Sequence, residues 1–153
     1  MLVYFLYGKD TKVVISPPTV KNDYTINKDT ADPKYLQEMG LYFTLLIGNL
    51  SDDNVDFVMQ VMKRHMTRKL NKEIKAALFD QITAIKQNNM ETTFDASDVI
   101  SISSNEVQVK GTRKTYLNDE LTEKMEMSYV WEFEIKNWFL YISDFSTNDP
   151  KQQ

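Results

Sequence analysis

A fifteen-residue alternation from Leu121 to Ile135 constrains the fold of this chain more than any other feature of its sequence. Its odd-numbered positions are apolar except for Glu123: Leu121, Met125, Met127, Tyr129, Trp131, Phe133 and Ile135. Its even-numbered positions are mostly polar or charged: Thr122, Lys124, Glu126, Ser128, Val130, Glu132 and Glu134. Successive side chains of a strand point to opposite faces, so this segment predicts a long strand with one buried and one solvated face. Such one-sided burial is typical of an antiparallel sheet.

Further strands are predicted on both sides of this segment. Val99–Ser103 and Glu106–Tyr116 precede it, and Trp138–Phe145 follows a turn at Lys136-Asn137. Gly111 lies inside the second of these strands, and a glycine there indicates a bulge or a bend. The polar residues 146–153 are expected to fray.

The region from Asp32 to Asn89 predicts helices instead. Asp32 is a suitable N-cap and Pro33 suits the first helical position, where a missing N–H costs nothing. The apolar residues then recur every three or four positions and form one face: Tyr35, Leu36, Met39, Tyr42, Phe43, Leu46, Ile47 and Leu50. Asn49 is expected to end this helix and Ser51 to cap the next one.

Two more helices are expected over about residues 52–65 and 66–87. Asp52, Asp53 and Asp56 crowd the predicted start of the second helix, where the helix dipole favours negative charge. A phase shift of the apolar pattern near His65 is the only indication of a break. The sequence is therefore compatible with two separate helices and with one continuous helix. Helices followed by an antiparallel sheet predict an α+β fold, with three helices covering one face of the curved sheet.

Bulk composition excludes several classes of protein. The 153 residues suffice for one domain, and the net charge of −4 argues against nucleic acid as the main partner. The chain has no cysteine, which excludes disulfides and thiolate metal sites. The apolar start, Leu2–Tyr7, is far shorter than the roughly 20 residues of a membrane helix. It lacks the features of a signal peptide, and it is a buried or edge strand, a sticky terminus, or the end of a membrane helix that precedes the domain.

No residue cluster predicts catalysis, a cofactor or a metal site. His65 is the single histidine, and its basic neighbours predict an exposed residue at a helix junction. Glu132 and Glu134 share a strand face that reads as solvated, and Ser143 has no basic partner nearby in the sequence. Asp144 is the best candidate for a perturbed carboxyl because it lies in an apolar strand, although such a residue more often bonds to the backbone.

A basic run is the clearest charged feature. It consists of Lys63, Arg64, His65, Arg68, Lys69 and Lys72. A solvated helix surface explains it most simply, while contact with acidic lipid, DNA or a partner protein is the alternative.

Four segments together resemble one known family. They are ISPPTV from Ile15, DPKYLQEMGLYF with LLIGNLSDDNV from Asp32, VQVKGTRKTY from Val107, and NWFLYISDF from Asn137. In this order they resemble the TraE family of conjugative type IV secretion systems, which is related to the eighth VirB component. The resemblance covers about residues 13–147. The chain lacks the Asn-Pro loop that the VirB branch uses for self-association, so the resemblance does not carry over that dimer.

The resemblance implies a fold, a location and a role. The fold is nuclear-transport-factor-2-like, a curved antiparallel sheet packed on N-terminal helices. The expected organisation is a linker over 1–30 after an inner-membrane helix, a periplasmic domain over 31–147, and a flexible tail over 148–153. The expected role is non-enzymatic assembly of the secretion channel through contacts with itself and with other channel subunits.

A small enzyme or ligand binder that uses the cup of the same fold is the alternative. The inward positions of the long strand are apolar except for Glu123, which favours a filled core over a reactive cavity. Exposed aromatic residues would be the natural anchors for partners. The candidates from the sequence are Tyr35, Tyr42, Trp138 and Tyr141.

Overall fold

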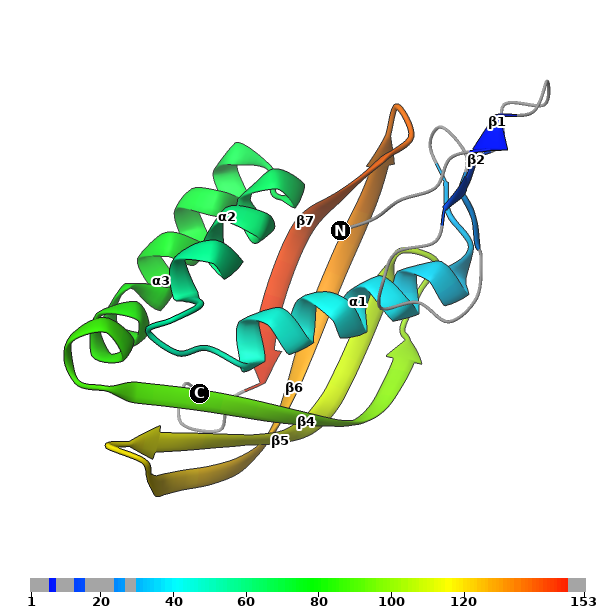
Figure 1. The fold of residues 1–153 in the computed structure, drawn as a ribbon. Coiled ribbons are helices and arrows are strands. Elements are labelled where there is room, and N and C mark those ends of the chain that lie inside the picture. Colours follow the sequence, from blue (N-terminus) through cyan, green and yellow to red (C-terminus); the bar gives the residue numbers. More distant parts are fainter. Residues whose placement is uncertain (1–5, 8–12, 16–23, 27–29, 149–153) are drawn as a thin grey trace.

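The main sheet is a four-stranded antiparallel meander. The structure, a computed structural model, describes residues 6–7, 13–15, 24–26 and 30–148. Its strands follow the order of the chain: β4 (Met90–Ser101), β5 (Glu106–Leu117), β6 (Glu120–Lys136) and β7 (Phe139–Asn148). Figure 1 shows a strongly curved sheet with the three helices on one side of it. This α+β arrangement confirms the predicted fold class.

A second, small sheet precedes the helices. Three short antiparallel strands form it in the order β1 (Leu6–Tyr7), β2 (Val13–Ile15) and β3 (Tyr24–Ile26). Most of the apolar start of the chain, the rest of the predicted linker over 1–30, and residues 149–153 of the predicted tail lie outside the described residues. Among the helices of the described ranges, none has the length and apolarity needed to cross a membrane.

Helix α1 (Pro33–Gly48) begins and ends as its sequence predicts. The Asp32 side chain accepts a hydrogen bond from the Lys34 N–H at 2.9 Å, Pro33 occupies the first helical position, and Asn49 is the C-cap. The predicted apolar face of this segment packs into the concave side of the sheet. That burial confirms the expected place of the helix in the core.

The start of α2 (Val55–His65) differs from the prediction. Asn54, not Ser51, is the N-cap, and its Oδ1 accepts from the Ser51 N–H at 2.9 Å instead of capping the helix. Asp52 and Asp53 therefore lie in the turn before the helix, where the dipole argument does not apply. The Ser51 carbonyl accepts from the Val55 N–H at 3.0 Å and closes this turn.

Helices α2 and α3 (Arg68–Gln87) are separate. Met66 between them forms a parallel bridge with Ile142 of β7. Thr67 then caps α3, and its Oγ1 accepts from the Leu70 N–H at 3.3 Å. The sequence did not decide between two helices and one. The structure has two, and they are separated where Met66 pairs with the edge strand of the sheet.

Strand β4 is much longer than the predicted Val99–Ser103, which was wrong about its start. It begins at Met90, soon after the end of α3. Residues of the loop after α1 accept hydrogen bonds from the backbone N–H groups on its outer edge. The Thr92 N–H donates to the Leu50 carbonyl at 2.9 Å, and the Phe94 N–H donates to Asn49 Oδ1 at 3.2 Å. These partners lie over 40 residues earlier in the chain, so a local pattern does not reveal them.

The β6–β7 hairpin also differs from its prediction. Lys136 pairs with Phe139, so the two-residue loop is Asn137-Trp138, with φ angles of 50° and 71°. Trp138 is therefore in the turn and not in the strand. Strand β7 continues past Phe145, and its last residues pair with β6, so residues 146–148 are not part of a frayed tail.

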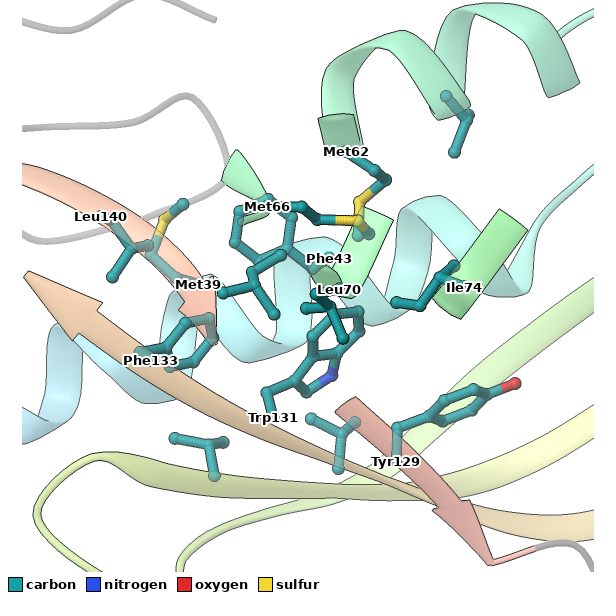
Figure 2. Close-up of a cluster of buried hydrophobic side chains, with 14 of the residues drawn as sticks. Met39, Phe43, Met62, Met66, Leu70, Ile74, Tyr129, Trp131, Phe133 and Leu140 are labelled. Atoms are coloured by element: carbon teal, nitrogen blue, oxygen red, sulfur yellow. The ribbon is translucent and has the colours of Figure 1, made fainter. Parts of the chain in front are cut away.

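The core lies between α1 and the central strands. Figure 2 shows Phe43 and Met39 of α1 against Trp131 and Phe133 of β6. Trp131 is completely buried, and its Nε1–H donates to Thr44 Oγ1 at 2.8 Å. Ser128 was expected on the solvated face but is buried, so the alternation of β6 is confirmed only from Tyr129 to Ile135. It fails at Leu121, which is 53% exposed because this end of the strand is not covered by the helices.

Candidate interaction surfaces and a pocket

His65 is buried, so the prediction of an exposed junction residue was wrong. Its ring stacks on Phe139 with centroids 5.1 Å apart, and its Nδ1–H donates to the Leu140 carbonyl at 3.1 Å. Burial lowers the pKa of His65, the Leu140 bond opposes this shift, and the charge of Arg64 adds to it. The missed signal was in the sequence. His65 continues the buried stripe of α2 that contains Val55, Val58 and Met62.

The carboxylates do not form an acid–base site. Asp144 is exposed, and its Oδ1 accepts from the Phe145 N–H at 2.9 Å, so it bonds to the backbone. Glu134 pairs with Lys136 at 3.3 Å on the surface, and the Ser143 hydroxyl donates to the Glu132 carbonyl at 3.2 Å. Within the described residues, no group of three or more His, Asp or Glu side chains is placed to hold a metal ion.

One pocket opens between α3 and the sheet. Its volume is about 240 Å³, and its polar contributors are mainly Glu73, Gln81 and Arg113. The apolar lining comes from α1, the loop after it, α3 and the sheet: Ile47, Leu50, Leu70, Ile74, Ala77, Leu78, Met127, Tyr129 and Phe145. Arg113 is oriented by Glu123, with Nη2 3.5 Å from Oε1. An apolar pocket of this size holds an aromatic ring, and the charged groups at its wall are the Arg113 guanidinium and the Glu73 carboxylate.

The β6–β7 hairpin presents an aromatic surface. We define the hairpin surface as Trp138, Phe139 and Tyr141 together with an adjoining shallow groove. The groove has a volume of about 440 Å³ and is lined by Thr67, Glu134, Lys136, Asn137, Phe139 and Tyr141. Phe139 is 40% exposed, and its ring lies 4.9 Å from that of Tyr141. Accessible aromatic side chains with charged neighbours are typical of protein interfaces.

The four aromatic residues proposed as partner anchors differ in how deeply they are buried. Tyr35 is only 3% exposed and belongs to the core, where burial raises its pKa. Tyr42 is half-buried on α1, and burial raises its pKa as well. Trp138 in the hairpin turn and Tyr141 in β7 are both half-buried, so these two remain candidates.

The basic run is divided by the fold. Lys63, Arg64, Arg68, Lys69 and Lys72 are exposed, whereas His65 is not. The two halves of the run flank the Met66-Thr67 break, so its members come from two helices.

Comparison with known proteins agrees with this architecture. The chain matches the family described as TraE protein over residues 1–147. Protein TraE of Escherichia coli K12 is 21% identical over 145 residues, which are 94% of this chain and 77% of that protein.

Three solved structures share the fold. Agrobacterium tumefaciens VirB8 superposes with a TM-score of 0.64 at 6% identity, over 76% of this chain and 92% of that one. A TrwG component of a type IV secretion system from Bartonella birtlesii gives 0.65 at 9% identity, over 78% and 94%. A TraE protein in complex with 2-chloroisonicotinic acid gives 0.62 at 8% identity, over 75% and 94%. These likenesses confirm the predicted nuclear-transport-factor-2-like fold.

Proposed function

Because the chain belongs to the TraE family, we propose that it is a non-enzymatic assembly component of a conjugative type IV secretion channel. In this proposal residues 31–147 form a periplasmic domain, and residues 1–30 connect it to a helix in the bacterial inner membrane. Its partners are other channel subunits and further copies of itself. No cofactor and no direct contact with nucleic acid are needed for this role.

A filled concavity is the observation that carries the proposal. Met39, Phe43 and Trp131 occupy the concave side of the sheet and are completely buried. The only histidine lies in the same core and bonds to a backbone carbonyl. The concavity is therefore a packed core where α1 fills it, which favours partner contacts on the outer surface.

The hairpin surface is the best candidate for these contacts. Trp138 has φ 71°, in the left-handed region that a two-residue hairpin loop normally reserves for glycine. A bulky residue there costs of order 1–3 kcal/mol, and such costs persist mainly where packing or function compensates for them. Phe139 and Tyr141 extend the same aromatic surface to the edge of the groove.

Gene deletion and complementation test the proposed role. Deleting the gene should abolish conjugative transfer, and the wild-type gene should restore it. Tyr141→Arg places a charge on the hairpin surface opposite Glu134, and we expect a transfer frequency at least 10-fold lower. Phe57→Ser on α2 is the matched control, because Phe57 is an exposed aromatic residue outside this surface.

The outcomes of this experiment are distinct. Undiminished transfer after deletion would overturn the proposed function. If deletion abolishes transfer but Tyr141→Arg folds and transfers normally, the role stands and the hairpin surface is not the contact. Thermal melts followed by circular dichroism show whether each variant is folded.

Ligand binding in the pocket is a second candidate function. It is favoured by the apolar lining with Arg113 at its wall, and a TraE protein of the same fold is known in complex with 2-chloroisonicotinic acid. That compound should bind this chain, as measured by titration calorimetry. Ala77→Phe should fill the pocket and abolish binding, whereas Ala76→Phe, at the neighbouring exposed position, should leave it unchanged. Equal effects of the two variants would exclude this pocket.

A further inference from the structure

Helix α3 presents a stripe of basic side chains with one aromatic residue inside it. We define the α3 stripe as Arg68, Lys72, Lys75, Phe79 and Lys86. At 100° per residue these five positions fall within an arc of about 60°, along about 27 Å of helix. The buried residues of α3 lie on another side of the helix: Leu70, Ile74 and Ile85.

The charges of this stripe are not balanced locally. Lys86 pairs with Asp56 of α2 at 2.7 Å, and Lys69 beside the stripe is 4.0 Å from Glu73. Over residues 30–148, no ion pair involves Arg68, Lys72 or Lys75, and all three are exposed. Arg68 and Lys72 are four residues apart, a spacing at which like charges repel.

The imbalance extends to the whole α2–α3 hairpin. Residues 55–87 contain seven Lys or Arg and three Asp or Glu, a net charge of +4, in a chain whose total is −4. The rest of the chain therefore carries −8. A segregated positive surface on an acidic protein favours an extended anionic partner.

Phe79 narrows the chemistry of that partner. It is 66% exposed, the largest exposed fraction among the large apolar side chains of the described residues, and it lies between Lys75 and Lys86 in the stripe. Figure 1 shows α2 and α3 together at one side of the domain, beside β7 and above β4. The partner has to accept cations and an apolar ring along the same line.

We propose that the α3 stripe docks on the surface of an anionic phospholipid bilayer. Headgroup phosphates accept the basic side chains, and the boundary of the acyl region accepts Phe79. Duplex DNA supplies phosphates but no apolar layer along the stripe, so Phe79 would stay in water. The inference rests on the proposed function, which places this domain beside the inner membrane.

Vesicle binding by the full chain tests the proposal. Cosedimentation compares mixed phosphatidylcholine–phosphatidylglycerol vesicles with pure phosphatidylcholine vesicles at low ionic strength. Wild type should bind only the anionic vesicles. The triple variant Arg68→Gln, Lys72→Gln, Lys75→Gln should bind about 100-fold more weakly, since each lysine or arginine near an anionic surface contributes about fivefold.

A charge-matched variant separates the stripe from net charge. Lys110→Gln, Lys114→Gln and Lys124→Gln also remove three positive charges, from strands β5 and β6 on the face away from the core. That variant should bind like wild type. Phe79→Ser should bind several-fold more weakly than Phe57→Ser, whose aromatic ring on α2 is equally exposed.

Three outcomes would overturn the proposal. They are no binding to anionic vesicles, equal losses in the two triple variants, or duplex DNA displacing the chain from vesicles at equal phosphate concentration. The last result would assign the stripe to nucleic acid. None of them depends on a secretion channel, so this inference can fail while deletion of the gene still abolishes transfer.

Discussion

At the scale of single residues, one buried hydrogen bond joins the sheet to the first helix. Trp131 Nε1–H donates to Thr44 Oγ1 at 2.8 Å, and the Thr44 hydroxyl donates to the Gly40 carbonyl at 2.7 Å. Thr44 and Trp131 are both completely buried. The alternation of β6 predicts that Trp131 is buried, but its partner lies 87 residues away.

Thr44→Val should lower the free energy of unfolding by about 1–3 kcal/mol. Valine keeps the shape of threonine but leaves the buried indole N–H without a partner, which costs its desolvation. Thr44→Ser is the control, because it keeps the hydroxyl and removes one methyl group, worth about 1 kcal/mol. Urea unfolding measures both variants. Thr44→Val matching wild type would show that this bond contributes no net stability.

His65 should make the stability of the fold depend on pH. Its pKa is lowered in the folded state, mainly by burial, so the unfolded chain binds a proton more readily. Its contribution is therefore fully present above the unfolded pKa of about 6.5 and is lost as pH falls below it.

Comparison with His65→Asn isolates this effect. Asparagine does not titrate and keeps an N–H donor near the Leu140 carbonyl. Between pH 7.5 and 5.5, wild type should lose more stability in urea unfolding than His65→Asn, because all carboxylates are common to both proteins. Parallel losses in the two proteins would contradict the assignment.

At the scale of elements, the β4–β5 pair depends on a close approach at Gly111. Ala96 pairs with Gly111 and Asp98 pairs with Lys110, so Ser97 is the extra residue of a bulge. The sequence predicted a bulge or bend at Gly111, and the structure places the extra residue on the opposite strand. A Cβ at position 111 would overlap the carbonyl oxygen of Asp95 and lie 2.6 Å from Phe94 Cζ.

Gly111→Ala should therefore destabilise the protein by about 1–3 kcal/mol, as overpacking does elsewhere. The clash is with backbone, which cannot move without disturbing the bulge. Gly40→Ala is the comparison, because its new Cβ would first meet the Val107 side chain, 2.9 Å away at Cγ1, and alanine favours the helix. Thermal unfolding should rank Gly111→Ala clearly below Gly40→Ala. The reverse order would show that the bulge adapts.

Local patterns predict the elements whose signals lie within one segment. The β6 strand is predicted because its burial alternates over many positions, and α1 because a cap and an apolar face coincide. The first half of β4 is not predicted, since its edge bonds go to Asn49 and Leu50 and only Thr92 and Phe94 are fully buried there. The Asp52-Asp53 pair misleads for a local reason, because Asn54 bonds to the Ser51 N–H and the turn that results precedes α2.

At the scale of the whole molecule, the surface features come from segments that only the fold brings together. The hairpin surface combines β6, β7 and Thr67, and the pocket combines α1, α3 and three strands. The apolar inward positions of β6 predicted that the concave side of the sheet is filled by a core. The pocket did not follow, because it depends on where α3 lies against the sheet.

The same geometry makes the stability of the molecule uneven. Helix α3 has buried residues near its ends, Leu70, Ile74 and Ile85, and none from 75 to 84, where it passes over the pocket. Helix α1 is buried along its whole length, with Tyr35, Leu36, Met39, Gly40, Phe43, Thr44 and Gly48 inside. Segments with few buried contacts open locally at lower free energy than the global transition.

Amide hydrogen exchange should therefore be faster in residues 76–84 than in residues 36–44. Both segments lie inside helices, so the difference would report tertiary burial and not helix fraying. Exchange followed by mass spectrometry measures both in one sample, and the variant Ala77→Phe should slow exchange in 76–84 by filling the space beneath α3. Equal protection of the two segments would show that α3 opens only when the entire domain unfolds.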